Sequence, residues 1–468
     1  MLENFIENDL YSRINKVLFG AENSEKKNLH VWHNSAFRFS EITPFTLLQT
    51  QGGVCGVLVA VQAFLLKHMI FGENGTKNLQ NLTIGKIYDC FANALTDIIV
   101  ICHGENAKEY NLVIPKSFDG QPLNGENIRN HLILTKLKTK EILKSQIKSE
   151  LDSFRNGPGI LALVCSAILG RGIDNVKKDM DDPNDFLIRR ECYCTQELVN
   201  LLISGRAASN VFDGEKRLGD NGNDEYVLTG IPERTDIGFL TILEAQGYTK
   251  VGEYYKTPKY PIWVVGSNDH YTVLFSTEDK LVLLSKDEEL ELGIRRIFNS
   301  FDQFETGYLD YKSLPELLQK LRLNKVQTAF VESQLIKNKD SEVFLLQQLI
   351  NAAMDSIKEF WSCPKCSFAN SNEDSRCQTC QTEKESSVFE RDNKESSNKE
   401  PLKTAELWHY NGMKLPGKNS GKLSELKIYF DHGYNLAQVG DNLRAVIHTK
   451  WPDSHVEFIK GTEKEVFI

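Results

Sequence analysis

The chain has 468 residues, of which 41% are hydrophobic and 25% charged, and it carries a formal net charge of −9. This length suffices for two or three domains, and the composition is that of an ordinary globular protein with at least one large core. The acidic balance argues against a nucleic-acid binder that uses a broad basic surface, so a nucleic-acid partner is not expected.

Neither a signal peptide nor a membrane span is expected. The N-terminal sequence "MLENFIENDLYSRINK" has acidic residues among its apolar ones, and the longest apolar run, residues 57–66, is too short to cross a bilayer. We therefore expect a cytoplasmic or nuclear protein with no membrane partner. Thiols stay reduced there, so the ten cysteines are expected to be ligands, nucleophiles or core residues rather than disulfides.

Residues 1–290 predict one mixed α/β domain. Helical periodicity appears in residues 84–102 and 195–212, whereas the polar stretch "DNVKKDMDDPNDF", residues 174–186, predicts a loop. In "YPIWVVGSNDHYTVLFS" two apolar runs flank a polar turn, Ser267-Asn268-Asp269, which predicts a pair of strands.

The second half of the chain predicts smaller parts. Residues 291–357 are mainly helical, and residues 359–383 form a compact cysteine-rich module. The charged, serine-rich residues 384–403 have little to bury and predict a disordered linker. Apolar runs return in residues 404–460, a segment that we expect to pack back on the first domain.

The helical region contains "FNSFDQFETGYLDYKSLPELL", which resembles an EF-hand. With Asp302 as loop position one, Gly307 falls at position six and Leu309 at position eight. Position three, however, is Phe304, and position twelve is Ser313 instead of the bidentate glutamate. We expect an EF-hand-like scaffold that does not bind calcium at resting levels.

The stretch "QTQGGVCGVLVAVQAFLL" places Cys55 between a glycine turn and an apolar helix. A cysteine at a helix N-terminus feels the positive end of the helix dipole and meets unpaired N–H groups, which favour the thiolate and can stabilise an oxyanion. Gln49, six residues earlier, has the spacing of the oxyanion glutamine of papain-like cysteine proteases. The alternative is that Cys55 is an inert, small core residue at a tight turn.

A thiol protease also needs a general base. Among ten histidines, His270 is placed most suggestively, in the polar turn that leads into the strand "YTVLFS". A neutral imidazole there can take the thiol proton and later protonate the leaving amine. The alternative is a histidine at a hairpin edge that makes only local hydrogen bonds.

Five motifs in one order resemble the MINDY family of cysteine deubiquitinases, in particular its branch with an EF-hand-like segment. They are "QTQGGVCGVLVAVQAFLL", "LVNLLISGRAASNVFDG", "YYKTPKYPIWVVGSNDHYTVLF", "HYNG" and "TKWP". The resemblance implies a papain-like α/β (α+β) fold with Cys55 as nucleophile, His270 as base and Gln49 as oxyanion glutamine. It also implies ubiquitin and polyubiquitin chains as partners, with a preference for linkage through lysine forty-eight of ubiquitin. One departure is Val54, where the family usually has proline.

The strongest local signal is the pattern W-x-C-x2-C-x3-N-x6-C-x2-C, with Cys363, Cys366, Cys377 and Cys380. Two cysteine pairs at this spacing can complete a tetrahedral shell around a structural Zn²⁺ ion. The spacing resembles Ran-binding-protein/NZF zinc ribbons, some of which bind ubiquitin and others single-stranded RNA. Phe368 and Thr379 nearly match the ubiquitin-binding positions, and only Arg376 would serve RNA. A purely structural ribbon is the third alternative.

These features predict a thiol isopeptidase that cuts ubiquitin chains. The rival hypothesis is a ubiquitin-binding adaptor with a decayed catalytic site that acts through the zinc ribbon. A third hypothesis, an RNA-associated protein, is disfavoured by the acidic charge.

Overall fold

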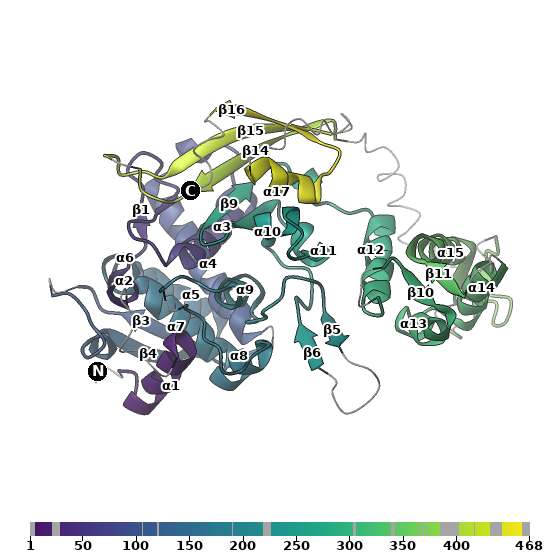
Figure 1. Ribbon diagram of the computed structural model, residues 1–468, viewed down its shortest axis with the longest axis horizontal. Helices are drawn as coiled ribbons and strands as arrows, with labels where there is room; N and C mark the ends of the chain where they lie inside the picture. Colours follow the sequence, from purple (N-terminus) through teal and green to yellow (C-terminus); the bar gives the residue numbers. More distant parts are fainter. Residues whose placement is uncertain are drawn as a thin grey trace. The chain divides into compact units, whose positions relative to one another are not determined.

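The computed structural model divides the chain into two compact units, which are described separately (Figure 1). The first unit comprises Met1–Asp213, Leu228–Val282 and Leu402–Ile468, and the second comprises Gly214–Val227 and Leu283–Pro401. The structure describes residues 5–460 apart from residues 21–28, 105, 119–120, 190, 219–225, 303–305, 338–341, 364, 367, 372, 384–401, 416 and 431–441. The expected disordered linker, residues 384–403, lies almost wholly outside the described residues, as does Phe304.

The first unit has a helical layer built around α3 (Cys55–Phe71), which is buried almost all round because its sequence is apolar on every face. Helix α3 packs against α4 (Ile84–His103) and α9 (Gln196–Ser204). The other α-helices among the described residues of this unit are α1 (Asn8–Phe19), α2 (Leu29–Asn34), α5 (Lys140–Ser149), α6 (Leu151–Asn156), α7 (Gly159–Arg171), α8 (Ile173–Asp179), α10 (Ile242–Ala245), α11 (Glu253–Lys256) and α17 (Asn442–Lys450).

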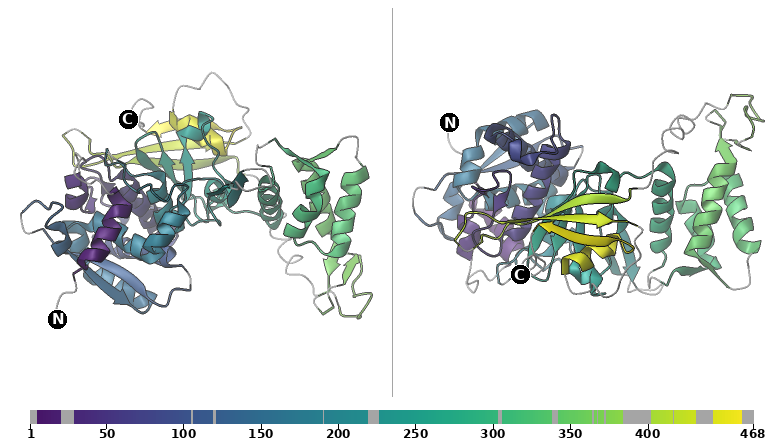
Figure 2. Two further views of the ribbon diagram at one scale, coloured as in Figure 1. Left: turned by 60° about the horizontal axis from the view of Figure 1, so that its bottom comes forward. Right: turned by 90° about the horizontal axis from the view of Figure 1, so that it is seen from above.

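A six-stranded sheet covers one side of α3. Its strand order is β16-β15-β14-β9-β8-β7, and only β7 and β8 run parallel (Figure 2). These strands are β7 (Gly238–Thr241), β8 (Ile262–Gly266), β9 (Tyr271–Phe275), β14 (Thr404–Asn411), β15 (Lys422–Tyr429) and β16 (His455–Lys460). Two-stranded pairs are formed by β1 (Arg38–Phe39) with β2 (Leu47–Leu48) and by β3 (Tyr110–Pro115) with β4 (Leu132–Leu137).

The two faces of this sheet bury different cores. Val264, Val273 and Phe275 face the large core that contains α3, whereas Trp263 and Leu274 face a second core with α17. This alternation is the period of two expected of a strand with both faces covered. Because β14 pairs with β9, the C-terminal part of the chain belongs to the same sheet as the strand that follows His270.

The second unit contains two helix–strand–helix segments with a core of their own. The first consists of α12 (Lys286–Asn299), β10 (Tyr308–Asp310) and α13 (Leu314–Lys320), and the second of α14 (Lys325–Lys337), β11 (Val343–Leu345) and α15 (Leu346–Glu359). Strands β10 and β11 pair antiparallel. The short pair β12 (Phe360–Ser362) and β13 (Ala369–Ser371) follows. Strands β5 (Glu215–Leu218) and β6 (Tyr226–Thr229) form another pair, and the sequence boundary between the units falls within β6, after Val227.

Several local expectations are confirmed and two are wrong. The helix after Cys55 and the strand pair β8/β9 are present. The polar stretch from Asp174 was expected to be a loop, but its first half lies in α8, because Val176 is buried and Asp179 pairs with Arg171 at 2.7 Å. The helix expected over residues 195–212 stops at Gly205, which adopts the left-handed conformation (φ 76°).

No single helix among the described residues is both long and apolar enough to cross a membrane. Helices α7 and α8 meet the length and composition test only as a pair, and the chain bends by 85° between them.

Candidate active site

Cys55 is the first residue of α3 and follows a turn that only glycine permits. Gly53 has φ +103°, and a Cβ atom there would lie 2.5 Å from the carbonyl oxygen of Cys192. The same carbonyl accepts a hydrogen bond of 2.9 Å from the Trp32 indole. The glycine turn is therefore held against a fixed neighbouring segment, which sets the position of Cys55.

The Cys55 thiol is almost completely buried, with 2% of the residue exposed. Burial raises its pKa to about 11, although hydrogen bonds from the backbone N–H groups of Tyr271, Gly56 and Cys55 itself act in the opposite direction. The Tyr271 contact is informative because Tyr271 begins β9 and directly follows His270. The structure thus brings the helix start and the histidine turn together.

His270 is also buried, and its ring is fixed by a residue from the other end of the chain. Its Nε2 lies 3.0 Å from Oδ1 of Asn411, the last residue of β14. Because an amide oxygen can only accept, Nε2 carries the proton and Nδ1 keeps its lone pair. Burial lowers the pKa of His270 and the Asn411 bond partly opposes that shift, so the imidazole is neutral at neutral pH.

Gln49 is hydrogen-bonded to the residues that directly follow Asn411 in the chain. Its backbone N–H donates to the Gly412 carbonyl at 2.7 Å, and its carbonyl accepts from Lys414 N–H at 2.9 Å. Its side-chain Nε2 donates to the Gln51 carbonyl at 3.0 Å. Residues 411–414 therefore hold both the glutamine backbone and the histidine ring.

The predicted residues Gln49, Cys55 and His270 thus meet at one place, the N-terminus of α3 beside the end of β14. Within the part of the chain that the structure describes, no hydrogen bond joins the Cys55 sulfur to the His270 ring. The thiol and the imidazole are both neutral, so the site holds the groups of a thiol hydrolase without a formed ion pair. Such a set can perform nucleophilic attack once Nδ1 accepts the thiol proton.

Asn411 is the residue that sequence reasoning missed. The motif "HYNG" contributes to the family resemblance, but the sequence around it gives its asparagine no role. Asn411 lies 141 positions from His270, and nothing local marks it as the histidine's partner. The pairing of β14 with β9, for example Tyr410 with Val273, brings it into place.

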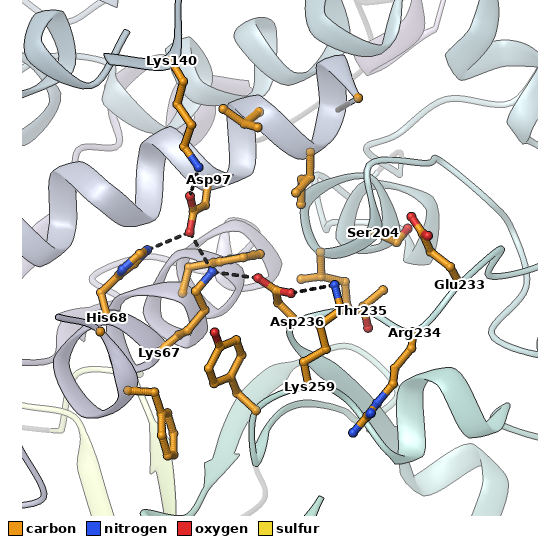
Figure 3. A pocket seen from close by; sticks show the side chains of 18 of the residues that line it. Lys67, His68, Asp97, Lys140, Ser204, Glu233, Arg234, Thr235, Asp236 and Lys259 are labelled. Atoms are coloured by element: carbon orange, nitrogen blue, oxygen red, sulfur yellow. Dashed lines mark hydrogen bonds and ion pairs between the residues drawn. The ribbon is translucent and has the colours of Figure 1, made fainter. Parts of the chain in front are cut away.

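The opposite end of α3 carries a network of charges beside a cavity of about 540 Å³ (Figure 3). Lys67 Nζ lies 2.7 Å from one carboxylate oxygen of Asp97 and 2.7 Å from one of Asp236. His68, Lys140 and Lys259 complete the network at 2.7–3.3 Å. Burial alone would lower the pKa of Lys67, but the two carboxylates outweigh it and raise that pKa.

This network ties α3 to α4, which carries Asp97, and to the segment that precedes β7, which carries Asp236. None of the residues gathered around Cys55 lines the cavity. The network therefore fixes the helix that presents Cys55 relative to the sheet, from the end that is remote from the thiol.

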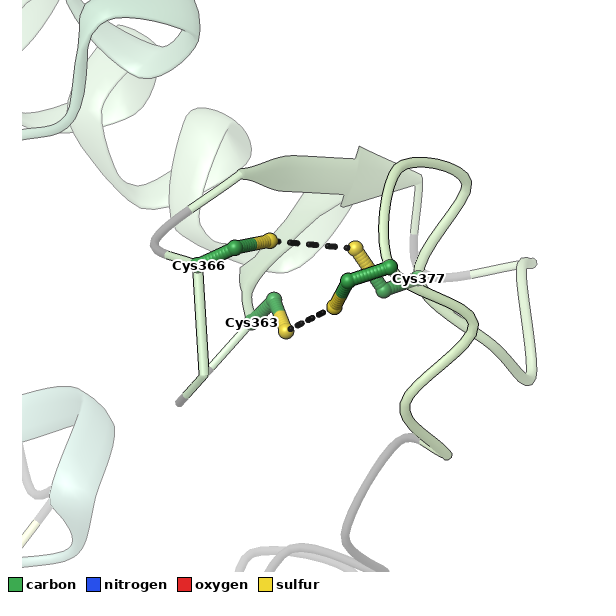
Figure 4. A group of neighbouring side chains, drawn as sticks. Cys363, Cys366 and Cys377 are labelled. Atoms are coloured by element: carbon green, nitrogen blue, oxygen red, sulfur yellow. Dashed lines mark hydrogen bonds between the residues drawn. The ribbon is translucent and has the colours of Figure 1, made fainter.

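In the second unit, Cys363, Cys366, Cys377 and Cys380 converge (Figure 4). All four sulfur atoms lie within 4.8 Å of one another, and the Cys363–Cys380 and Cys366–Cys377 pairs are 3.4 and 3.5 Å apart. Sulfurs around a tetrahedral Zn²⁺ with Zn–S bonds near 2.3 Å are separated by about 3.8 Å. The cluster therefore fits a metal ion such as zinc.

Two turns frame this cluster. Cys363 N–H donates to Phe368 O at 2.9 Å and Cys377 N–H to Thr382 O at 2.8 Å. The buried Asn370 links the turns, because its side chain donates to Phe368 O and accepts from Gln378 N–H. Phe368, with 40% of its surface exposed, projects from the first turn, and Thr379 is exposed on the second.

Comparison with known proteins assigns the chain to a family. Residues 15–352 match the domain family described as "Deubiquitinating enzyme MINDY-3/4, conserved domain". A probable ubiquitin carboxyl-terminal hydrolase MINDY-4 from Xenopus tropicalis is 35% identical over 58% of this chain and 36% of the relative. A ubiquitin carboxyl-terminal hydrolase MINDY-3 from Danio rerio is 31% identical over 62% of this chain and 69% of the relative.

A ubiquitin carboxyl-terminal hydrolase MINDY-3 homolog from Drosophila melanogaster is 27% identical over 95% of this chain and 81% of the relative. The chain spans only about a third of the length of the relatives named MINDY-4. No solved structure matches it. Since the family match covers well over half of the sequence, the chain belongs to the MINDY-3/4 family of deubiquitinating enzymes.

Proposed function

We propose that this protein is a papain-like thiol isopeptidase that hydrolyses the isopeptide bonds of ubiquitin chains, with Cys55 as the nucleophile. The observation that carries the proposal is that the amide of Tyr271 points at the Cys55 sulfur while the preceding residue, His270, has its ring fixed by Asn411. Family membership and the hydrolase activity for which the relatives are named support it.

His270 Nδ1 accepts the thiol proton as the Cys55 sulfur attacks the carbonyl carbon of the isopeptide bond. The resulting imidazolium is held by the Asn411 amide and then protonates the leaving lysine amine. Water, activated by the same imidazole, hydrolyses the thioester. Because burial raises the thiol pKa to about 11, proton transfer to His270 rather than free ionisation must generate the thiolate at neutral pH.

The negative oxygen that forms during each attack needs hydrogen-bond donors. We assign this role to the Cys55 backbone N–H at the start of α3 and to the Gln49 side-chain amide. Gln49 Nε2 has two hydrogens, so its bond to the Gln51 carbonyl leaves one for the oxyanion.

For the second unit we propose a structural Zn²⁺ on the four cysteines and a weak ubiquitin contact centred on Phe368 and Thr379. The exposure of both side chains on adjoining turns supports this role. The helix–strand–helix pair is proposed to be an EF-hand-like scaffold that holds no calcium. Both Asp302 oxygens already accept hydrogen bonds within the loop, from Thr306 and from Gly307 N–H.

The preferred linkage is proposed from family resemblance to be lysine forty-eight. A panel of defined ubiquitin chains, digested by wild type, Cys55→Ala and a matched Cys165→Ala control, tests the whole proposal. Cys165 is a buried thiol in α7, so its alanine variant should cut chains at the wild-type rate. Cys55→Ala should lose cleavage and retain chain binding, since the thiol contributes chemistry and little contact area.

Cleavage by Cys55→Ala would remove Cys55 from the nucleophile role. Binding of chains by the wild type without any cleavage, and without labelling by ubiquitin carrying an electrophilic C-terminus, would instead identify a ubiquitin-binding adaptor.

A further inference from the structure

A second thiol lies beside Cys55 at the first turn of α3. Cys194 precedes α9, and its sulfur lies 3.2 Å from the Gly53 carbonyl, in the glycine turn that presents Cys55. A Cβ atom at position 56 would lie 3.0 Å from Cys194 Cβ and 3.1 Å from Cys194 Sγ. The absence of a side chain at Gly56 therefore lets Cys194 approach the helix start closely.

The two thiols lie at the same backbone amide. The Gly56 N–H favours the thiolate form of Cys55 and also that of Cys194. The charge of one sulfur is felt by the other, because a Cys55 thiolate raises the pKa of Cys194. Gly56 directly follows Cys55, and the Cys194 side chain lies against Gly56, so the two cysteines are neighbours at the start of α3.

We propose that Cys194 is the resolving cysteine of Cys55, so that a hydroperoxide oxidises Cys55 to a sulfenic acid and Cys194 then closes a reversible Cys55–Cys194 disulfide. This regulatory role rests on the proposed function, because it stops catalysis only if Cys55 is the nucleophile. Formation of the disulfide itself does not depend on that assignment.

The reaction balances in two steps. In the first, the Cys55 sulfur attacks one peroxide oxygen, the O–O bond breaks, and the sulfenic acid forms with loss of water from hydrogen peroxide. In the second, the Cys194 sulfur attacks the sulfenic sulfur, the S–O bond breaks, and a second water leaves. Two thiols are oxidised by two electrons and one peroxide is reduced.

The consequence is protection as well as inhibition. A sulfenic acid without a neighbouring thiol is oxidised further to the sulfinic acid, which thiol reductants do not reverse. A disulfide at this position would return to two thiols when a reductant is added. Burial raises the pKa of the Cys55 thiol, and only the thiolate attacks peroxide readily. The reaction is therefore expected after His270 has accepted the thiol proton.

The test uses the full chain as wild type, Cys194→Ala and Cys165→Ala, treated with one to a few equivalents of hydrogen peroxide. Peptide mapping by mass spectrometry without reduction should show a Cys55–Cys194 linked peptide in the wild type and in Cys165→Ala. In Cys194→Ala, Cys55 should be found as sulfinic acid or as the adduct of a sulfenic-acid trap. Thermal unfolding of Cys194→Ala confirms that the variant is folded.

Cleavage activity, expressed relative to each untreated variant, should return fully on reduction in the wild type and only in small part in Cys194→Ala. Equal accumulation of sulfinic Cys55 in wild type and Cys194→Ala, or a Cys55 disulfide to any other cysteine, would overturn the proposal. A failure of the proposed function is distinguishable, because an active Cys55→Ala variant would contradict the nucleophile role whatever the peptide map shows.

Discussion

The protein has two cysteine sites that are built in opposite ways. The four-cysteine cluster is assembled within 18 consecutive residues, Cys363 to Cys380, and each pair lies on one tight turn. The candidate active site is assembled from Gln49, Cys55, His270 and Asn411, which span most of the chain. Sequence spacing alone therefore specifies the first site, whereas the second exists only when the strands and helices of the first unit have packed.

Their stability has different sources. Cys55 belongs to a large hydrophobic core, so its surroundings remain in place without any ligand. Among the described residues of the cysteine module few apolar side chains are buried, so its sulfur atoms must be held together by a metal. Loss of a cysteine should consequently remove chemistry from one site and structure from the other. Four predictions follow this contrast from the largest effect to the smallest.

Removal of the metal should unfold residues 359–383. Structural Zn²⁺ contributes about 10–16 kcal/mol to comparable small modules, more than such a segment can replace by packing. Chelation, or Cys363→Ser combined with Cys366→Ser, should abolish amide protection there in hydrogen exchange. The helices around Phe298 and Phe344 have their own core and should stay protected.

The matched control for this change is Cys55→Ser, the same substitution in the other site. It should leave amide protection of the cysteine module and the thermal unfolding of the first unit unchanged while abolishing cleavage. Amide protection of residues 359–383 that persists in the double serine variant after chelation would contradict the prediction that the metal holds this module together.

Gln49→Ala should lower kcat by about 10²–10³-fold with little change in KM, the usual effect of losing one oxyanion donor. Gln51→Ala is the control. Gln51 accepts the hydrogen bond of the Gln49 side-chain amide with its backbone carbonyl, which the substitution keeps, and its own side chain is exposed. Steady-state kinetics on a fluorogenic ubiquitin substrate measure both variants. An effect confined to KM would mean that Gln49 holds substrate rather than the transition state.

Asn411→Ala should lower kcat by about 10–10²-fold, the equivalent of roughly 1–3 kcal/mol for an unsatisfied buried partner. The Asn411 hydrogen bond raises the pKa of His270, so its loss should move the acid limb of the kcat/KM profile to lower pH. Asn419→Ala, in the same segment but bonded to Glu41, should leave the profile unchanged. An unshifted acid limb in Asn411→Ala would contradict the assigned role.

Phe368→Ala should slow the cleavage of long ubiquitin chains several-fold, which corresponds to about 1 kcal/mol of lost binding free energy. Diubiquitin should still be cleaved at the wild-type rate. A weak second contact acts through effective concentration, which matters only for a chain long enough to reach it. Lys365→Ala, another exposed residue of the same turn, is the control. A wild-type ratio of long-chain to short-chain cleavage in Phe368→Ala would leave the module without a ubiquitin role.

Much of the candidate site could be predicted because its parts have local signatures. A glycine turn before an apolar run marks the start of α3 at Cys55, and a polar turn between two apolar runs marks the strand that begins after His270. Helix α8 was missed because its polar composition hides the burial of Ile173 and Val176 and the Asp179–Arg171 pair. That helix is stabilised by tertiary contacts, which override weak local propensity.

The sequence by itself determined the cysteine cluster, the helix that presents Cys55 and the turn that carries His270, because each depends on groups a few residues apart. Only the tertiary structure decided that Asn411 holds the His270 ring, that Lys67 joins Asp97 to Asp236, and that Cys194 lies at the start of the helix that presents Cys55. The physical reason is that these contacts depend on strand register and helix packing. Both are set by the burial of many apolar side chains at once, and no single pair of residues encodes them.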